Sequence, residues 1–295
     1  MSWRTVILST ESKVSLRMNH LVVSGEKVST VPLEEINVLL IENPNIVLTG
    51  HILNALTDKQ ITTILCDQRH YPTTVIQRVF GHHRQTKKIK EQFSWSLAKK
   101  DFLWGEMIKQ KIKNQQKLLD YFDLPNADFF TTYINEVVPG DSTNREGVAA
   151  KTYFLSLFGS QFTRSEDDIQ NWALNYGYAI LHSLFSRHIV GKGLLTEIGI
   201  HHSNEYNAHN LSSDFMELFR PLVDFFVYQY IRGDIFEKAE RRKIIKMLEV
   251  KVWIRDGHYY LDQCVQIYLD KMILYLNTGD EKELVFPNFD FSQYY

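Results

Sequence analysis

The chain has 295 residues, of which 44% are hydrophobic and 13% are aromatic. A chain of this length and composition can bury one large core or two smaller ones, which excludes a disordered protein and predicts two domains. The formal net charge of -2 excludes a uniformly basic protein. Any nucleic-acid partner must therefore be held by local basic patches.

Cys66 and Cys264 are the only cysteines, and they lie far apart in the sequence. This excludes a disulfide framework and a cysteine-based zinc site, and it fits a reducing compartment. The first residues lack the basic segment and apolar core of a signal peptide, and no apolar run is long enough to span a bilayer. We expect a soluble, cytoplasmic protein with no membrane partner.

The first part of the chain has the pattern of β-strands. Apolar and polar residues alternate up to residue 23, and residues 24–27 (Ser-Gly-Glu-Lys) form a hairpin-turn sequence. Residues 36–41 and 61–66 are nearly continuous apolar runs, which is typical of strands covered on both faces. Thr49 can cap a short helix between these two runs. We predict a small, β-sandwich-like domain over residues 1–80, and hence an α+β protein.

From residue 81 the apolar residues follow a helical period of 3.6. We therefore predict a larger, all-helical domain over residues 81–295, in which the aromatic residues after Thr278 pack against the body. Three apolar stripes carry this prediction: Ile89, Phe93 and Leu97; Trp104, Ile108, Ile112 and Leu119; and Val265, Tyr268, Leu269, Met272, Ile273 and Leu276.

The segment from residue 84 to residue 117 carries ten Lys and Arg against three acidic residues, an excess of seven positive charges. One interpretation is a solvated helix face. The other is a surface that binds DNA phosphates, which is favoured because the excess is one-sided in a chain that is acidic elsewhere. The residues assigned to DNA binding as a hypothesis are Arg84, Lys87, Lys88, Lys109, Lys111, Lys113 and, from a later segment, Arg220.

Turn residues lead into a helix near Glu146. With Thr143 as N-cap, Glu146 occupies the third helical position and completes a capping box. From the local sequence alone this structural role is favoured over a catalytic one, because caps are far commoner than catalytic carboxylates.

The segment over residues 201–221 brings imidazole, amide and carboxylate groups into a short span that enters a helix, with Ser212 or Ser213 as N-cap. Asp214 and Glu217 then lie three residues apart on one helical face, where like charges repel. Either Arg220 or a bound metal ion, which would also recruit His202, can offset that repulsion. A surface or hydrogen-bonded role for His202 stays open as well.

Together these stretches resemble a known family, the universal adaptation protein of CRISPR systems, which is the first CRISPR-associated protein. The resemblance rests on four motifs in the right order, in a form most similar to the type II branch. They are Glu-Gly-Val-Ala-Ala-Lys-Thr-Tyr-Phe (146–154), Leu-Asn-Tyr-Gly-Tyr-Ala-Ile-Leu (174–181), Gly-Ile-His-His (199–202), and the run from Asn207 through Asn210-Leu-Ser to Asp214-Phe-Met-Glu-Leu-Phe-Arg-Pro (214–221).

The resemblance implies a metal-dependent DNA endonuclease and integrase whose metal ligands and catalytic residues are Glu146, His202 and Glu217. Asp214 lies close by, where some relatives use a second acid, and Phe215 replaces the Leu that relatives more often carry. Two carboxylates and an imidazole suit Mg²⁺ or Mn²⁺. Such an ion would assist attack by a DNA 3′-hydroxyl, which joins strands, or by water, which cleaves them.

The resemblance also implies partners. The 1–80 domain would form a homodimer, and the 81–295 domain would carry catalysis and DNA binding. A small ferredoxin-like adaptation partner would bridge two dimers, the type II effector nuclease would cooperate, and the DNA would be a short double-stranded fragment and the CRISPR repeat. Two alternatives remain: a non-catalytic helical DNA-binding scaffold, and a metal-dependent nuclease that acts on branched DNA in repair.

Overall fold

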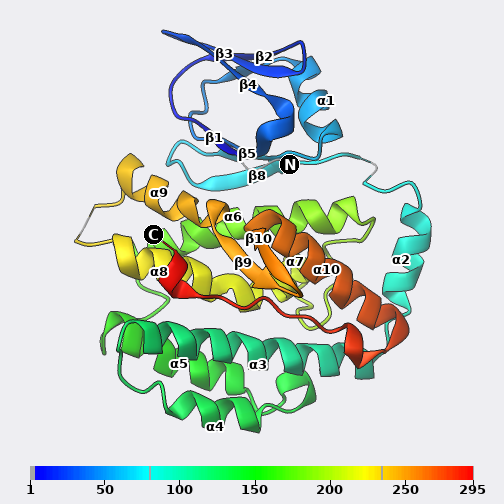
Figure 1. Cartoon of the computed structure of the whole chain (residues 1–295), viewed down its shortest axis with the longest axis vertical. Coiled ribbons are helices and arrows are strands. Elements are labelled where there is room, and N and C mark those ends of the chain that lie inside the picture. Colours follow the sequence, from blue (N-terminus) through cyan, green and yellow to red (C-terminus); the bar gives the residue numbers. More distant parts are fainter. Residues whose placement is uncertain (1–3, 80, 234, 295) are drawn as a thin grey trace.

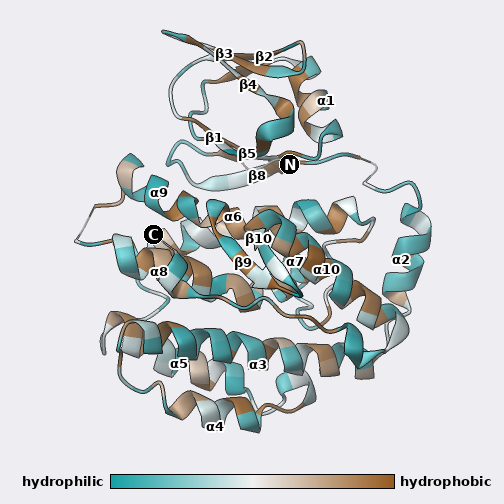
Figure 2. Cartoon of the chain, in the orientation of Figure 1, coloured by the Kyte–Doolittle hydropathy of each residue, from teal (hydrophilic) through white to brown (hydrophobic). Residues whose placement is uncertain are grey.

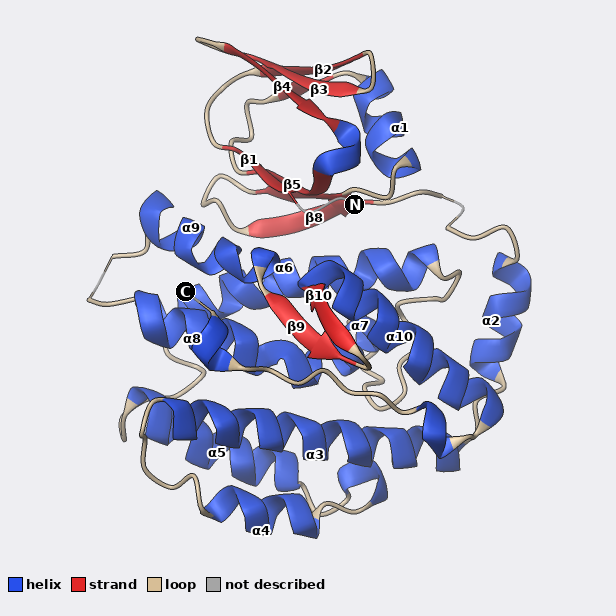
Figure 3. Ribbon diagram, in the orientation of Figure 1, coloured by secondary structure: helices blue, strands red, loops and turns tan. Residues whose placement is uncertain are grey.

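The computed structural model describes residues 4–79, 81–233 and 235–294. A strand-rich N-terminal region stacks on a larger helical region (Figures 1 and 3), which confirms the predicted α+β class. The last N-terminal strand ends at Ile76 and the next helix begins at Gln85. The predicted domain boundary at residue 80 lies outside the described residues. No helix in the described part of the chain combines the length and the apolarity that crossing a membrane requires.

Among the described residues, the N-terminal region consists of two four-stranded sheets, a 3₁₀ turn at Leu33–Glu35 and one α-helix, α1. One sheet has the order β1-β5-β7-β8, with only β8 antiparallel, and the other has the order β4-β3-β2-β6, with β2 and β6 parallel. The bounds are β1 Arg4–Leu8, β2 Lys13–Arg17, β3 His20–Ser24, β4 Val28–Pro32, β5 Ile36–Ile41, β6 Val47–Leu48, α1 Gly50–Asp58, β7 Thr62–Cys66 and β8 Pro72–Ile76.

Local signals predicted this region well. The turn after β3 joins two antiparallel strands, and the Thr49 side chain accepts a hydrogen bond from the Ile52 N–H at the start of α1. All residues of β5 are buried. Successive side chains of a strand point to opposite faces of the sheet, so both faces are covered at β5. Leu39 belongs to the core between the two sheets, whereas Leu40 packs into the core of the helical region. Strand β5 therefore contributes one face to the core between the two sheets and the other face to the core of the helical region.

The helical region also contains a β-hairpin, β9 and β10, so the prediction of an all-helical second part is wrong in this detail. Its sequence signal is Asp256-Gly257, where the turn residue Asp256 precedes Gly257, the first residue of the second strand. The elements are α2 Gln85–Phe93, α3 Leu97–Tyr121, α4 Phe129–Glu136, η2 Pro139–Asp141, α5 Arg145–Phe158, α6 Ile169–Gly191, α7 Asn210–Met216, η3 Glu217–Phe219, α8 Arg220–Tyr230, α9 Lys238–Ile245, η4 Lys246–Glu249, β9 Lys251–Ile254, β10 Gly257–Tyr260, α10 Leu261–Thr278, η5 Glu281–Glu283 and η6 Phe291–Gln293.

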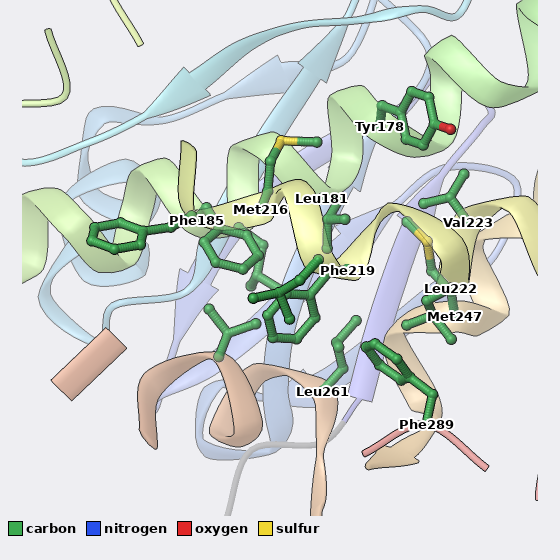
Figure 4. Packing of buried hydrophobic residues seen from close by; sticks show 14 of the residues in the cluster. Tyr178, Leu181, Phe185, Met216, Phe219, Leu222, Val223, Met247, Leu261 and Phe289 are labelled. Atoms are coloured by element: carbon green, nitrogen blue, oxygen red, sulfur yellow. The ribbon is translucent and has the colours of Figure 1, made fainter. Parts of the chain in front are cut away.

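Two of the three predicted apolar stripes are buried as expected, and Figure 2 shows hydrophobic and hydrophilic residues interspersed along α3. The prediction of the first stripe is wrong. One helix, α2, ends at Phe93 and the next, α3, begins at Leu97, and these two residues are 62% and 71% exposed. Figure 4 shows Phe185 of α6 and Phe219 of η3 packed in the centre of the helical core. The C-terminal aromatic residues pack on the body as predicted, since Phe289 and Phe291 are buried.

Candidate active site

Glu146 lies in the first turn of α5, but the capping box predicted for it is absent from the described structure. Asn144, not Thr143, is the N-cap, and its side chain accepts a hydrogen bond from the Gly147 N–H at 3.2 Å. The carboxylate of Asp141 accepts hydrogen bonds from the N–H groups of Arg145 and Glu146, each at 2.9 Å. Because other side chains satisfy these donors, the Glu146 carboxylate is free to point inward, toward α3.

Glu217 lies where α7 gives way to the 3₁₀ turn η3, and its side chain is 5% exposed. Buried neighbours such as Phe219 anchor this turn (Figure 4), so the carboxylate is held in place. Helix α7 begins at Asn210, with His209 as N-cap, so the predicted caps at Ser212 and Ser213 are wrong. Helix α7 ends at Met216, so Asp214 belongs to α7 and Glu217 belongs to η3.

Lys111 of α3 connects the two glutamates. Its Nζ donates a hydrogen bond to Glu146 Oε1 at 2.5 Å and another to Glu217 Oε2 at 2.6 Å, while Arg220 Nε lies 2.9 Å from Glu217 Oε1. Burial alone would raise the pKa of Glu217, but Arg220 and Lys111 outweigh it and hold that pKa at about 2. Burial likewise opposes the charge of Lys111, yet Glu217 and Glu146 keep the pKa of Lys111 above its ordinary value.

His202 lies in the loop before α7, and a buried carboxylate fixes its orientation. Asp214 is fully buried and accepts hydrogen bonds from the N–H groups of Ile200, His201 and His202 at 2.6, 3.1 and 3.0 Å. It also accepts one from His202 Nδ1 at 2.6 Å, which raises the pKa of His202 above its ordinary value. Since Nδ1 is engaged, Nε2 is the nitrogen left for a ligand.

The two adjacent histidines therefore have different roles. The ring of His201 stacks on Trp104 of α3, with 4.1 Å between the centroids and 3° between the planes. His202 meets Trp104 edge-on, and its side chain is 41% exposed. His202 is thus the histidine that is oriented by a carboxylate and accessible from outside, as expected for a metal ligand.

Glu146 and Glu217 open onto a cavity of about 230 Å³, whose wall also includes Arg164, Tyr178 and Arg220. The guanidinium of Arg220 lies over the Tyr178 ring at 4.7 Å, and that of Arg164 lies over the same ring at 5.6 Å. Both cationic and acidic side chains line this cavity, an arrangement that suits a phosphate group approaching a metal ion.

The structure thus brings two of the three predicted ligands together and places the third close enough that Glu217 and Glu146 both raise the pKa of His202. No group of three or more His, Cys, Asp or Glu side chains within residues 4–79, 81–233 and 235–294 could hold a metal ion as the side chains stand. The donor set nevertheless fits a hard divalent cation, because a cationic nitrogen already lies between the two carboxylates.

Lys111 corrects one prediction, because a side chain that is 8% exposed and paired with two acids is not a surface contact for DNA. Its position in the sequence carried a usable signal. Lys111 lies three residues after Ile108 and four after Met107, in the buried stripe of α3, where a lysine needs an acidic partner.

The other residues assigned to DNA binding differ in their surroundings. Arg84 and Lys113 are exposed. Lys87 and Lys88 both pair with Glu91, and Lys109 pairs with Glu106 at 2.7 Å. These pairs are partly exposed, with side chains between 29% and 64% exposed, so they contribute little to stability and can be exchanged for a phosphate.

Comparison with known proteins agrees with this architecture. The family model described as CRISPR associated protein Cas1 matches residues 5–245. A CRISPR-associated endonuclease Cas1 from Neisseria meningitidis serogroup C is 35% identical to this chain, over 97% of this chain and 96% of the relative.

Two solved structures share the fold at 17% identity each. One is a casposase bound to its integration product, with a TM-score of 0.75; the match covers 100% of this chain and 94% of the casposase chain. A Cas6-RT-Cas1–Cas2 complex has a TM-score of 0.72 and covers 97% of this chain and 36% of the other. The matching family model and the relative that is 35% identical show that the chain belongs to the Cas1 family of CRISPR-associated proteins.

Proposed function

We propose that this protein is a divalent-metal-dependent DNA integrase and endonuclease that inserts short foreign DNA fragments into a CRISPR array. The observation that carries the proposal is that the carboxylates of Glu146 from α5 and Glu217 from η3 meet at Lys111 Nζ, in a cavity that is also lined by arginines. The names of the relatives support it, since one is called an endonuclease and one solved structure contains an integration product.

Glu146, Glu217 and Nε2 of His202 would hold Mg²⁺ or Mn²⁺. When bound, such an ion supplies Lewis-acid polarisation of the scissile phosphate. Asp214 holds His202 in the tautomer that leaves Nε2 available. Arg220 and Arg164 line the cavity and can bind the non-bridging phosphate oxygens.

The proposed joining reaction is a transesterification. A DNA 3′-hydroxyl attacks a phosphorus in the repeat and loses its proton, and a new P–O bond forms. The P–O bond to the old 3′ oxygen breaks, and that oxygen takes up a proton and leaves as a 3′-hydroxyl. One phosphodiester replaces another, so no external energy source is needed. Attack by water instead of the hydroxyl gives cleavage.

Glu146→Gln tests this proposal. We expect the variant to lose Mn²⁺-stimulated strand transfer of a 3′-hydroxyl fragment into repeat DNA while it keeps its DNA affinity. Glu136→Gln is the control, because Glu136 pairs only with Arg145 in the described structure, at the surface. Equal strand transfer by Glu146→Gln and the wild type, or strand transfer that persists in a chelator, would refute the catalytic role.

One observation favours the non-catalytic scaffold as a second candidate: Glu217 is paired with Arg220 and so has a cationic partner without a metal ion. In such a scaffold Glu146 would have only a capping role, but Asn144, not Glu146, caps α5. Strand transfer by the wild type distinguishes the scaffold from the integrase. Activity on branched DNA without a repeat would instead favour the repair nuclease.

The DNA path would use exposed cations, chiefly Arg84 and Lys113, with Lys87, Lys88 and Lys109 exchanging their glutamate partners for phosphates. Charge reversal at Lys109 and Lys113 should weaken DNA binding and reduce the slope of log affinity against log salt by about one per lost phosphate contact. Unchanged affinity and slope would refute this path.

The proposed assembly is a homodimer through the strand-rich region, with two dimers bridged by a small ferredoxin-like adaptation partner and assisted by the type II effector nuclease. The fold shared with the Cas1-containing chain of a Cas1–Cas2 complex supports an adaptation partner of that kind. Light scattering of the purified chain, alone and with the partner from the same gene cluster, tests both associations. A monomer that does not change with the partner present would refute them.

A further inference from the structure

We propose that Lys111 is a resident cation of the active site, which a divalent ion must displace from Glu146 and Glu217 onto Gln115. This inference rests on the proposed metal-dependent function and assigns a role in it to Lys111. Lys111 positions Glu146 and Glu217: it holds the two carboxylates together in the absence of a metal ion, and it releases them when a metal ion binds.

The first observation is the place of the ammonium. Lys111 Nζ lies 2.5 Å from Glu146 Oε1 and 2.6 Å from Glu217 Oε2. An ammonium has three donors and no lone pair, so it occupies carboxylate lone pairs that a metal ion would need. Two cations cannot share those oxygens, because their mutual repulsion is large in a poorly hydrated site.

The second observation is the balance of charge. The negative charges of Glu146 and Glu217 are matched by Lys111 and Arg220, all four within one hydrogen-bonded or ion-paired cluster. A divalent ion added to this cluster would leave an excess of two positive charges. Departure of the Lys111 ammonium reduces that excess, so metal binding and lysine departure are coupled.

The third observation is an acceptor where the displaced ammonium can go. Gln115 lies one helical turn after Lys111 on the same face of α3, lines the same cavity and is 2% exposed. Its Oε1 is buried and accepts no hydrogen bond from any described residue. A buried acceptor without a donor is costly, so an approaching ammonium would be bound there. The flexible four-carbon stem of lysine permits the move.

The test is Mn²⁺ affinity, measured from the electron paramagnetic resonance signal of free Mn²⁺ in the presence of the full chain. Lys111→Met removes the competing ammonium and keeps an unbranched side chain that is one atom shorter, so affinity should rise about tenfold, which corresponds to about 1.4 kcal/mol. Gln115→Met removes the second position of the ammonium, so affinity should fall severalfold. Lys151→Met, an exposed lysine on the same helix as Glu146, should leave it unchanged.

Unchanged or weaker Mn²⁺ affinity in Lys111→Met, with binding intact in the wild type, would overturn this inference alone. Absence of Mn²⁺ binding in both proteins would overturn the proposed metal site as well. Wild-type protein provides a second measurement that needs no folded variant: Mg²⁺ should increase acylation of Lys111 relative to Lys151 in peptide mass spectra, because a displaced Lys111 loses the two carboxylates that keep its pKa above its ordinary value. An unchanged ratio would refute the displacement.

Discussion

Glu217→Gln measures how much the buried charge cluster contributes to the free energy of unfolding. In the folded protein the pKa of Glu217 falls from its ordinary value of 4.5 to about 2, because Arg220 and Lys111 outweigh the effect of burial. Each pKa unit corresponds to about 1.36 kcal/mol, so ionised Glu217 stabilises the fold by about 3 kcal/mol. This agrees with the cost of breaking a buried ion pair, about 3 to 5 kcal/mol.

The sign of the pH dependence follows from the direction of the pKa change. The folded-state pKa lies below the unfolded one, so the stabilisation is complete above the unfolded value and disappears as the pH falls toward about 2. The wild type should exceed Glu217→Gln by about 3 kcal/mol at pH 7 and by about half of that near pH 3.

Urea unfolding at several pH values, in a chelator so that no metal contributes, provides these free energies. Glu136→Gln is the matched control, since the Glu136 side chain is 47% exposed and its pair with Arg145 should contribute about 0 to 1 kcal/mol. A Glu217→Gln effect no larger than that of the control, or one that stays constant from pH 7 to pH 3, would refute the reasoning.

Two further predictions concern the loop that carries His202. Asp214→Asn removes the carboxylate that holds His202 Nδ1, so the pKa of His202 should fall toward its ordinary value in an NMR titration while that of His209, which is lowered mainly by burial, stays the same. A Cβ on Gly199 would lie 2.3 Å from the His202 carbonyl oxygen and 2.6 Å from Asp214 Oδ2, so Gly199→Ala should cost about 1 to 3 kcal/mol in chemical denaturation. Gly191→Ala meets no atom within 4 Å at the end of α6 and should leave stability unchanged or slightly higher; equal effects of the two substitutions would contradict the steric argument.

Local chemistry made parts of the fold predictable. The turn after β3 and the cap at Thr49 depend on neighbouring residues only, so the sequence sufficed. Phe93 and Leu97 were predicted to share one stripe because the period continued across residues 94–96. The break was nevertheless signalled by Ser96, whose side chain accepts a hydrogen bond from the Lys99 N–H at the start of α3.

The charge cluster was less accessible to sequence reasoning, because it joins elements that are distant in the chain. Lys111 and Glu217 are 106 residues apart, and no local pattern relates α3 to η3. Glu146 had a local interpretation as a cap, and only the pairing of Asn144 and Asp141 with the backbone donors shows that its carboxylate is free. The resemblance to a family identified the acids, but it did not identify the lysine between them.

The Gly-Ile-His-His motif (199–202) has a physical reason in this chain, which concerns the spacing from Gly199 to His202. Asp214 accepts three successive backbone N–H groups, which forces the loop to wrap around a fully buried carboxylate. That wrapping brings Gly199 so close to Asp214 that no Cβ fits, and it places the fourth residue of the motif, His202, where its Nδ1 reaches the same carboxylate. Gly199, His202 and Asp214 are therefore parts of one structure. Substitution of the glycine should disturb the imidazole as much as substitution of the aspartate, although the glycine has no side chain to take part in the chemistry.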